Sequence, residues 1–447
     1  MSKHQVALWV WLATAFIGGV ANAESLNLPE TSFAEFRTII LETLKTQPEL
    51  FLEKSRLEEL AQRRTEVAAQ RLPQVRFGFE NRSDIVSADR TAFDSGNRLD
   101  AVVTASQLLY DFGASGYKVA AADLEIEAQR WQRRVIREEL VLDLISAHYE
   151  VARNQALQSL ALTNVEEHKV LVEQVEERVQ AGAGSKADLL RARSQWVAAR
   201  TALTTINGQL RSSERIYHER FQMRSQQLYR VAPGFLKPVQ ELPSESQTLS
   251  TNPRYQSVRQ KTESAKFAAL GAARDSLPKL SLELQGRRFD VDDSDLAEDD
   301  LAVLVSVDYP LYSGGAQSAR TRQAAARQAQ GEYQQQVLLR EITRQEQTAR
   351  NAITTREEEM ALAAESLAAD RSVLDAYKAQ FQIGRRSLGD VLDAQRDVFE
   401  SGRRLVNASF DYDLANYSLL QIHGELLPIF DEARGTELQG SGDVHAN

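Results

Sequence analysis

The sequence predicts a mainly α-helical chain that also contains two pairs of β-strands, built as two copies of one plan. Three observations predict this class. Long stretches lack proline, short stretches alternate apolar and polar residues, and motifs of the first half recur 202 residues later, as Tyr110 and Tyr312 do. Similarity at a fixed spacing is typical of an internal repeat. The two repeats are expected at about 47–230 and 252–424.

The N-terminus has the pattern of a secretory signal peptide. Lys3 and His4 precede an apolar run over 6–20, and an Ala-Asn-Ala triplet follows. A basic start, an apolar core and a small-x-small site are typical of cleaved export signals. A membrane anchor is the weaker alternative, because the run is shorter than the ~20 residues needed to span a bilayer. We expect a signal peptide over 1–23 and a mature chain over 24–447 without a transmembrane helix.

Two long helical hairpins are predicted from the placement of proline. No proline occurs over 111–232 or 311–427, and proline is the strongest interruption of a helix. Within them, the stretches 114–181 and 316–383 would each be ~100 Å long as helices. In the first, ten of twelve positions spaced alternately three and four apart are apolar. A seven-residue repeat sustained this far indicates helices that coil left-handedly around their neighbours.

Four strands are predicted between the short and long helices. Along the first, Val75, Phe77 and Phe79 alternate with polar residues. This pattern fits a transmembrane barrel with a wet lumen, and a soluble sandwich would show the same alternation. Because small barrels need about eight strands, either the sheet stays open or several chains contribute. The predicted strands are 73–81, 99–109, 278–287 and 301–311.

Composition and motifs argue against several function classes. A net charge of −10 and a pI near 5.4 do not suit nucleic acid, which calls for a basic patch. The absence of cysteine excludes disulfides, thiol catalysis, cysteine metal sites and a lipidated N-terminal cysteine. The segment 182–186 lacks the spacing of a phosphate loop, and the acidic loop 291–300 lacks the calcium-loop pattern. We therefore predict no enzyme, no cofactor and no metal.

Two matching elbows join the long helices of each repeat. They read "AGAGSKADLLRARSQ" over 181–195 and "IGRRSLGDVLDAQRD" over 383–397. Together with "QLLYDFG" over 107–113, the duplicated halves and the signal peptide, they resemble the TolC-like outer-membrane factors over essentially the whole mature chain.

The resemblance implies a TolC-like homotrimer in the outer membrane of a Gram-negative bacterium. Each chain would give four strands to a 12-stranded outer-membrane β-barrel. The long helices would continue it as a periplasmic α-helical barrel, closed at its far end by the elbows. An equatorial segment is expected at about 209–252, and a flexible C-terminal tail over 431–447.

In this family, acidic side chains inside the second elbow ring the entrance, and an arginine there ties neighbouring hairpins together. By motif position these are Asp390, Asp393 and Arg386, with Asp188 as the matching acid of the first hairpin and the likeliest partner of Arg386. Phe381 stands where some relatives have a tyrosine that takes part in closure. Alternatively, the acids of both Ser-x-x-Asp motifs only cap their helices, although Asp393 lies a turn deeper.

The wording "G-x-R-S-L-x-D-V-L-D-A-Q" is more similar to channels that serve type I secretion, for example of an adhesin. The implied partners are a periplasmic adaptor (membrane fusion protein), an inner-membrane ABC transporter and outer-membrane lipid. The alternative is the outer-membrane component of a multidrug or small-molecule efflux pump. A periplasmic coiled-coil adaptor would also show a signal peptide and long hairpins. It would lack the four amphipathic strands and would usually carry a lipoyl-like β domain.

Overall fold

The computed structural model describes residues 33–83, 97–231, 249, 251–289, 291 and 298–430. The predicted signal peptide and C-terminal tail lie outside these residues, as do most residues of the loops predicted within each strand pair. The chain divides into two compact units. Among the described residues, the helical unit comprises 33–46, 138–231 and 345–430, and the sheet unit comprises 47–83, 97–137, 249, 251–289, 291 and 298–344.

The helices follow the predicted order, and their lengths repeat. The two longest have 67 residues each, ~100 Å at 1.5 Å per residue, and the helices after the elbows have 36 each. The predicted hairpins are thereby confirmed. Every helix in the described ranges falls short of the length or the apolarity that a membrane crossing demands. The helices are α1 (Phe33–Leu44), α2 (Pro48–Ala69), α3 (Ala114–Gln180), α4 (Lys186–Phe221), α6 (Pro253–Arg274), α7 (Ala316–Gln382), α8 (Leu388–His423) and α9 (Leu426–Phe430).

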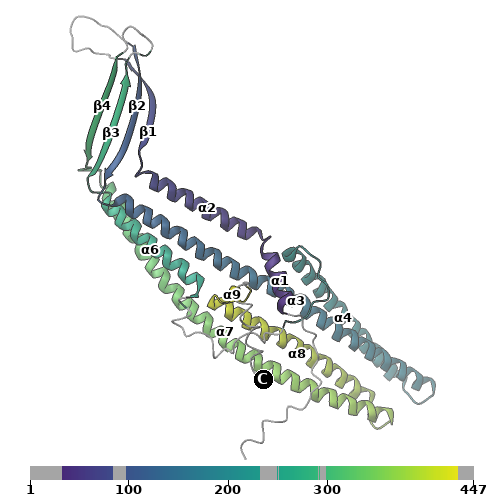
Figure 1. Ribbon diagram of the computed structural model, residues 1–447. Helices are drawn as coiled ribbons and strands as arrows, with labels where there is room; N and C mark the ends of the chain where they lie inside the picture. The colour runs from purple at the N-terminus through teal and green to yellow at the C-terminus, as the bar shows by residue number, and fades with distance from the viewer. Residues whose placement is uncertain are drawn as a thin grey trace, which may run out of the picture. The chain divides into compact units, whose positions relative to one another are not determined.

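Four strands form one antiparallel sheet in the order β1-β2-β3-β4 (Figure 1). The last strand ends before the predicted limit of 311, because Pro310 has no N–H to donate to a neighbouring strand. At the other predicted boundary, α4 extends to Phe221 and so occupies the first part of the segment expected to be equatorial. The strands are β1 (Gln74–Ser83), β2 (Asn97–Tyr110), β3 (Lys279–Arg288) and β4 (Asp299–Asp308).

The two faces of this sheet differ in polarity, as the alternation predicts. Phe77 lies opposite Val103, and Leu301 lies opposite Gly286, on one continuous apolar face. The large apolar side chains of β1 and β4 on this face are 62–72% exposed in the single chain. On the other face, Arg287 forms ion pairs with Glu80 and Asp100, each at 3.1 Å, and Asp100 is fully buried.

The four helices of the sheet unit lie side by side in the same order as the strands that they join (Figure 1). Arg64 of α2 pairs with Asp123 of α3 at 2.9 Å. The Ser264 hydroxyl of α6 donates to the Ala121 carbonyl of α3 at 2.8 Å. Gly331 of α7 lies so close to α6 that a Cβ there would be 3.1 Å from Thr262. The order β1-β2-β3-β4 thus continues as α2-α3-α6-α7.

Aromatic side chains form the core of the helical unit. Tyr149 of α3 lies edge-on to Phe410 and Tyr417 of α8, with ring centroids 5.7 Å apart in both pairs. Phe36 of α1 and Phe430 of α9 pack together with their centroids 6.0 Å apart, and both are fully buried. The two short helices outside the predicted repeats therefore help to seal this core.

A buried ion pair crosses the same core and generates a stability prediction. Arg230 contacts Asp413 twice, with Nε 2.5 Å from Oδ2 and Nη2 2.8 Å from Oδ1, and the carboxylate is fully buried. Asp413→Ala would leave the mostly buried guanidinium without this partner, which typically costs ~3–5 kcal/mol. We expect the free energy of unfolding, measured in detergent by circular dichroism, to fall by about that amount.

The matched control is Asp397→Ala, which removes an exposed carboxylate that pairs with Arg396 at 3.4 Å. Exposed pairs contribute at most ~1 kcal/mol. Equal losses in the two variants would contradict a structural role for the buried pair.

Candidate functional site

Each long hairpin turns at an elbow that begins with a glycine in the left-handed region. Gly182 and Gly384 both have φ of 75°. At each elbow the glycine N–H donates to the carbonyl three residues earlier, at 3.1 and 3.0 Å. The next N–H donates to the carbonyl five residues earlier, at 2.8 and 2.9 Å. This is the Schellman arrangement, in which glycine avoids the steric cost of a side chain. The two elbows therefore have the same backbone geometry.

The second elbow carries a complete capping box. The Ser387 hydroxyl oxygen accepts from the Asp390 N–H at 3.2 Å, and the Asp390 carboxylate accepts from the Ser387 N–H at 3.3 Å. The carboxylate also accepts a 2.8 Å hydrogen bond from the Ser387 hydroxyl. This last hydrogen bond is the main reason that the pKa of Asp390 lies below the usual 3.8, with smaller contributions from Arg386 and Arg191. Asp390 therefore caps α8, and its additional role in a gate stays a prediction.

The first elbow differs although it has the same Ser-x-x-Asp motif. The Ser185 hydroxyl oxygen accepts from the Ala187 N–H at 3.1 Å. Asp188 is exposed, and its carboxylate has no hydrogen bond or ion pair with any other residue in the described part of the chain. Asp188 thus does not cap α4 and is available to a partner.

The other predicted gate residues, Arg386 and Asp393, both form ion pairs within the second hairpin. Arg386 Nε lies 3.5 Å from Asp390 Oδ2, and its guanidinium lies 3.9 Å above the centre of the Tyr377 ring. Asp393 pairs with Arg396 at 3.2 Å, and both side chains are more than half exposed. Arg386 and Asp390 therefore contact each other within one elbow, whereas no ion pair joins Asp393 or Asp188 to either of them in the described residues. Pairing of Arg386 with a neighbouring chain stays a prediction.

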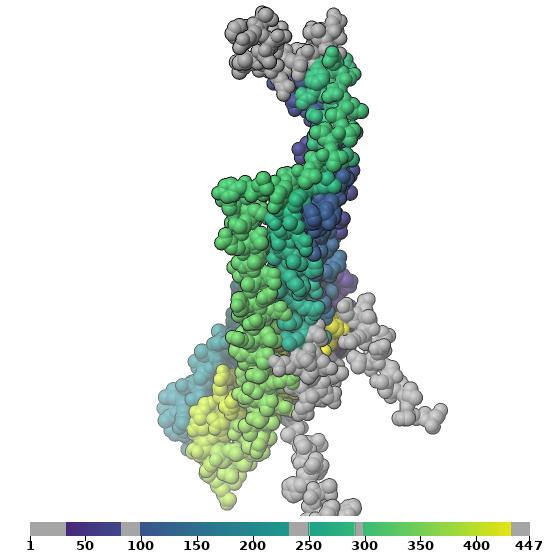
Figure 2. All heavy atoms as spheres, turned by 90° about the vertical axis from the view of Figure 1, so that its left-hand side faces the viewer, coloured from purple at the N-terminus to yellow at the C-terminus, as the bar shows by residue number. Residues whose placement is uncertain are grey.

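An apolar cluster beneath the elbows packs the two hairpins against each other. Val391 at its centre is fully buried. In Figure 2 the yellow α8 lies beside the teal α4, and these two helices are in contact. The cluster gives both elbows a common support. Its buried members are Leu171, Val172 and Val175 of α3, Ala192 of α4, Leu374 of α7, and Leu388, Val391, Leu392 and Ala394 of α8.

Two arginines of the first hairpin contact the second elbow, and the sequence did not indicate them. Arg178 Nη2 donates to the carbonyls of Phe381 at 3.1 Å and Gln382 at 2.9 Å. Arg191 lies against Gly389, where a Cβ would be 3.0 Å from its Nη1. Arg178 binds main-chain carbonyls, and Arg191 lies beside a glycine that has no side chain. Neither contact can be recognised from the sequence. A basic residue in the last turn of a helix, as Arg178 is, is usually read as a partner of its own helix.

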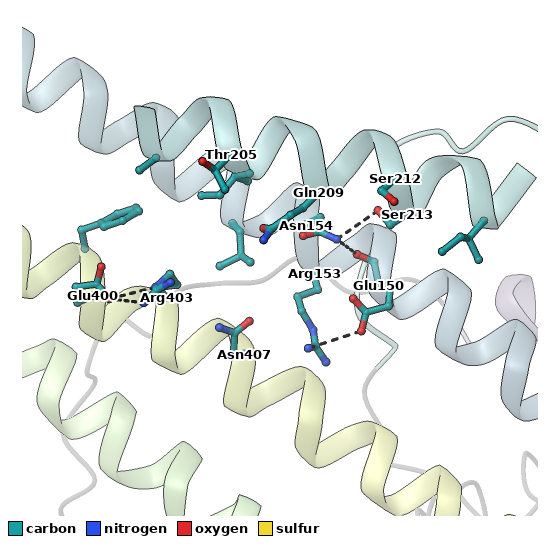
Figure 3. Close-up of a pocket in the computed structure, with 15 residues that line it drawn as sticks. Glu150, Arg153, Asn154, Thr205, Gln209, Ser212, Ser213, Glu400, Arg403 and Asn407 are labelled. Atoms are coloured by element: carbon teal, nitrogen blue, oxygen red, sulfur yellow. Dashed lines mark hydrogen bonds and ion pairs between the residues drawn. The ribbon is translucent and has the colours of Figure 1, made fainter. Parts of the chain in front are cut away.

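Hollows occur among the described residues of the helical unit. One of about 410 Å³ borders the elbow contacts and is lined by Glu167, Lys378 and Phe381 among others. A larger one of about 650 Å³ lies between α3, α4 and α8 (Figure 3). In it, Arg153 pairs with Asp411 and Arg403 pairs with Glu400, both at 2.6 Å. Among the described residues, no group of three or more His, Asp or Glu is placed to hold a metal.

The different states of the two elbow acids generate a prediction. Asp390→Ala removes the carboxylate half of the capping box, so we expect amide hydrogen exchange in the first turn of α8 to quicken about fivefold. Asp188→Ala, the matched control, should leave the first turn of α4 unchanged. Because the pKa of Asp390 is depressed, its contribution is complete at neutral pH and is lost as the pH falls through that low pKa. Equal effects of the two substitutions would contradict the assignment.

Comparison with known proteins agrees with this architecture. The family model described as "Outer membrane efflux protein" matches residues 39–216 and 245–425. The outer membrane protein TolC of Vibrio cholerae is 24% identical over 79% of this chain and 82% of its own. The outer membrane efflux protein BepC of Brucella suis is 22% identical over 72% and 71%. The alkaline protease secretion protein AprF of Pseudomonas aeruginosa is 22% identical over 74% and 70%.

Solved structures share the fold. The outer membrane protein VceC of Vibrio cholerae superposes with a TM-score of 0.77 over 88% of this chain and 96% of its own, at 18% identity. The family model covers both repeats, and the predicted TolC-like fold is confirmed. The chain belongs to the outer membrane efflux protein family.

Proposed function

We propose that three copies of this chain form an outer-membrane channel that exports protein in a type I secretion system. The observation that carries the channel is the four-stranded sheet with one exposed apolar face and one polar face. Lipid suits the first face, and a water-filled lumen suits the second. Since about eight strands are the minimum for a barrel, four require other copies, and three copies supply twelve.

Exposed apolar side chains on the helices support the same assembly. The helix α2 is at one end of the helix order α2-α3-α6-α7 and leads into β1. Its Phe51 and Leu52 side chains are 56% and 53% exposed in the single chain. The helix α7 is at the other end of this order and follows β4. Its Tyr333 and Val337 side chains are 67% and 66% exposed. Monomeric soluble proteins rarely expose runs of large apolar residues. Packing of α2 of one copy against α7 of the next would cover both sets.

The proposed location follows from the family and from the length of the helices. Members of this family lie in the outer membrane, and α3 and α7 are long enough to reach far into the periplasm. At the end of the hairpins, the elbows would surround the periplasmic entrance. We infer that Asp390, Asp393, Arg386 and Asp188 form its gate, with Arg386 of one copy facing Asp188 of another.

Two observations favour protein secretion as the task of the channel. One is the sequence motif of the second elbow, and the other is the similarity to AprF, which is named for secretion of alkaline protease. A periplasmic adaptor and an inner-membrane ABC transporter are the partners that such a system needs. The likeness to BepC, which is named an efflux protein, favours the alternative of small-molecule efflux.

Deletion of the gene separates these two tasks. We expect the deletion strain to lose one or more proteins from the culture medium while its susceptibility to drugs and detergents stays within about twofold of the parent. The comparison uses mass spectrometry of the medium and inhibitory concentrations, with the restored gene as control. Unchanged medium together with marked drug sensitivity would favour efflux and overturn the secretion proposal.

The gate generates a second prediction, on ion selectivity. In three copies Asp390 and Asp393 would form rings, and rings of acidic side chains favour cations. Replacing both by alanine removes the carboxylate that pairs with Arg386 and one of the two carboxylates that pair with Arg396. We therefore expect the reversal potential in a salt gradient across planar bilayers to lose its cation preference and move toward anions.

The control for the double variant is Glu358→Ala with Asp375→Ala. These two exposed acids of α7 lie outside the elbow, and their loss changes the net charge by the same amount. The same shift in both double variants would show that net charge, and not the elbow, determines selectivity.

A further inference from the structure

We propose that four exposed arginines at the base of the sheet form an arginine collar that binds the headgroups of anionic phospholipids in the periplasmic leaflet of the outer membrane. The inference rests on the proposed channel function and adds a partner to it. The base of the sheet is the end at which the strands meet α2, α3, α6 and α7 (Figure 1). In the proposed channel this end faces the periplasm, so the lipid beside it belongs to the periplasmic leaflet. The collar consists of Arg71, Arg274, Arg320 and Arg322.

The base of the sheet is basic, although the chain as a whole is acidic. The relevant segments are the four connections between strands and helices, each taken with the two helical turns next to it. They contain seven Lys or Arg and three Asp or Glu, whereas the whole chain has a net charge of −10. An anionic surface therefore attracts this level of the molecule more strongly than the rest. The segments are 62–73, 111–121, 267–278 and 309–323.

The four members of the collar are the cations of these segments that lack a carboxylate partner. All four are exposed, and none forms an ion pair with a residue in the described part of the chain. Their charge is thus available to a ligand. The other three cations are paired, Arg63 with Glu125 at 3.7 Å, Arg64 with Asp123 at 2.9 Å, and Lys118 with Asp275 at 2.7 Å.

Arg71 lies next to the apolar face of the sheet. Gln107 of β2 stands opposite Leu282 of β3, and directly opposed residues of an antiparallel pair share one face. Leu282 belongs to the apolar face, since it lies opposite Val305 of β4. The Gln107 side-chain amide donates to the Arg71 carbonyl at 2.7 Å. The chain at Arg71 is therefore fastened to the base of the face that we assign to lipid.

The other three members of the collar belong to helix ends that lie side by side. Gln317 of α7 donates from its side-chain amide to the Ala272 carbonyl of α6 at 2.9 Å. This contact places the first turns of α7, which carry Arg320 and Arg322, beside the last turn of α6, which ends at Arg274. Repulsion among neighbouring like charges falls when an anion binds, and guanidinium groups suit phosphate oxygens.

Two exposed aromatic rings mark the level of the lipid headgroups. The register between β2 and β3 shifts between Leu108 and Tyr110, so that Tyr110 lies opposite Leu280 on the apolar face. The Phe112 ring lies beside it, with ring centroids 4.8 Å apart, and the two side chains are 55% and 40% exposed in the single chain. Aromatic side chains are enriched where a membrane meets water. The headgroups therefore lie at the base of the sheet, level with the collar.

The turn after β2 accepts backbone strain in order to carry Phe112. This residue has φ of 54°, in the left-handed region that bulky residues avoid. The second repeat has Gly314 at the matching position, 202 residues later, with φ of 64°. Glycine thus satisfies the turn, and strain of this kind is typical of functional positions. The exposed ring therefore accounts for phenylalanine here, and lipid is the apolar surface next to it.

A phospholipid matches both parts of this surface. Its phosphate group accepts charge-assisted hydrogen bonds from arginine, and its acyl chains continue along the apolar face above the rings. A soluble phosphate has no apolar part to contact Tyr110 and Phe112. An anionic lipid such as phosphatidylglycerol also carries the net negative charge that phosphatidylcholine lacks. The collar should therefore distinguish these two lipids.

A neighbouring copy is the alternative partner for part of the collar. Arg320 and Arg322 belong to α7, which in the proposed trimer packs against α2 of the next copy. Glu66 of α2 is exposed and has no ion pair within the described residues, so it offers them a carboxylate. This alternative requires a trimer that loses stability without the arginines even when no lipid is present, and no preference for anionic lipid.

Binding of a fluorescent phosphatidylglycerol to the purified full-length trimer in neutral detergent tests the collar. The variant combines Arg71→Gln, Arg274→Gln, Arg320→Gln and Arg322→Gln. We expect its apparent dissociation constant to rise about tenfold, since each arginine near an anionic surface adds to the attraction. With the wild type, unlabelled phosphatidylglycerol should compete well, and phosphatidylcholine and glycerol phosphate should compete poorly.

The matched control removes the same charge from the helical unit. It combines Arg200→Gln, Arg211→Gln, Arg215→Gln and Arg224→Gln, which are also exposed arginines without an ion pair among the described residues. Its affinity for phosphatidylglycerol should match that of the wild type. An equal loss of affinity in the two variants would show that net charge, and not the collar, attracts the lipid.

A second measurement checks the level of the membrane. In liposomes, the fluorescence that Phe112→Trp adds should be quenched more by lipids brominated near the headgroup than by lipids brominated near the ends of the acyl chains. Wild-type protein supplies the background from the native tryptophans. No quenching, or stronger quenching from the chain ends, would place the ring away from the headgroups and overturn the collar.

The outcomes distinguish this inference from the proposed function. A wild type that conducts in planar bilayers but binds phosphatidylglycerol no better than phosphatidylcholine would overturn only the collar. Equally strong competition by glycerol phosphate would do the same, and so would a collar variant that keeps its lipid affinity but melts at a lower temperature without lipid. A wild type that forms neither a trimer nor a channel would overturn the proposed function, and the collar with it.

Discussion

The structure depends on one constraint, the hydrogen-bonding groups at the two edges of a sheet with only four strands. In the described residues β1 pairs only with β2, and β4 pairs only with β3, so one edge of each has unpaired N–H and C=O groups. Hydrocarbon offers these groups no partner, which is why only closed barrels span membranes as sheets. With its apolar face exposed, this sheet cannot remain open in lipid, and the need for further copies follows.

The same constraint extends into the helices. Each strand is joined to a neighbouring helix, and the order of the strands is repeated in the order α2-α3-α6-α7. If the edge strands of this sheet pair with strands of other copies, the outer helices α2 and α7 must pack against helices of the same copies. The side chains on the two outer helices agree, since large apolar residues are exposed on both α2 and α7. Each of the two repeats contributes one helical hairpin, so each copy of the chain has two elbows.

Chemistry at the elbows combines short-range and long-range contacts. Gly182 and Gly384 end their helices by the same local hydrogen bonds. Beyond these, the elbows differ, because Asp390 lies near Arg386 and Arg191, whereas Asp188 has no cation paired with it in the described residues. Asp390 is thus held by its own elbow and Asp188 is free to bind another chain, although both belong to a Ser-x-x-Asp motif.

The sequence by itself determined the features that depend on residues close together in the chain. The absence of proline predicted two hairpins, alternation predicted the two faces of the sheet, and Ser387 with Asp390 predicted a capping box. Each of these rests on interactions over a few residues or on a simple period. Only the tertiary structure decided that Asp188 does not cap, that Arg178 binds the carbonyls of α7, and that Gly389 makes room for Arg191. The two arginine contacts join residues about 200 positions apart. Arg178 binds main-chain carbonyls, which every residue has, and Arg191 occupies the space beside a glycine, so no pattern in the sequence distinguishes either contact. The missing cap at Asp188 depends on how one side chain is turned, because the same Ser-x-x-Asp motif forms a capping box at Ser387.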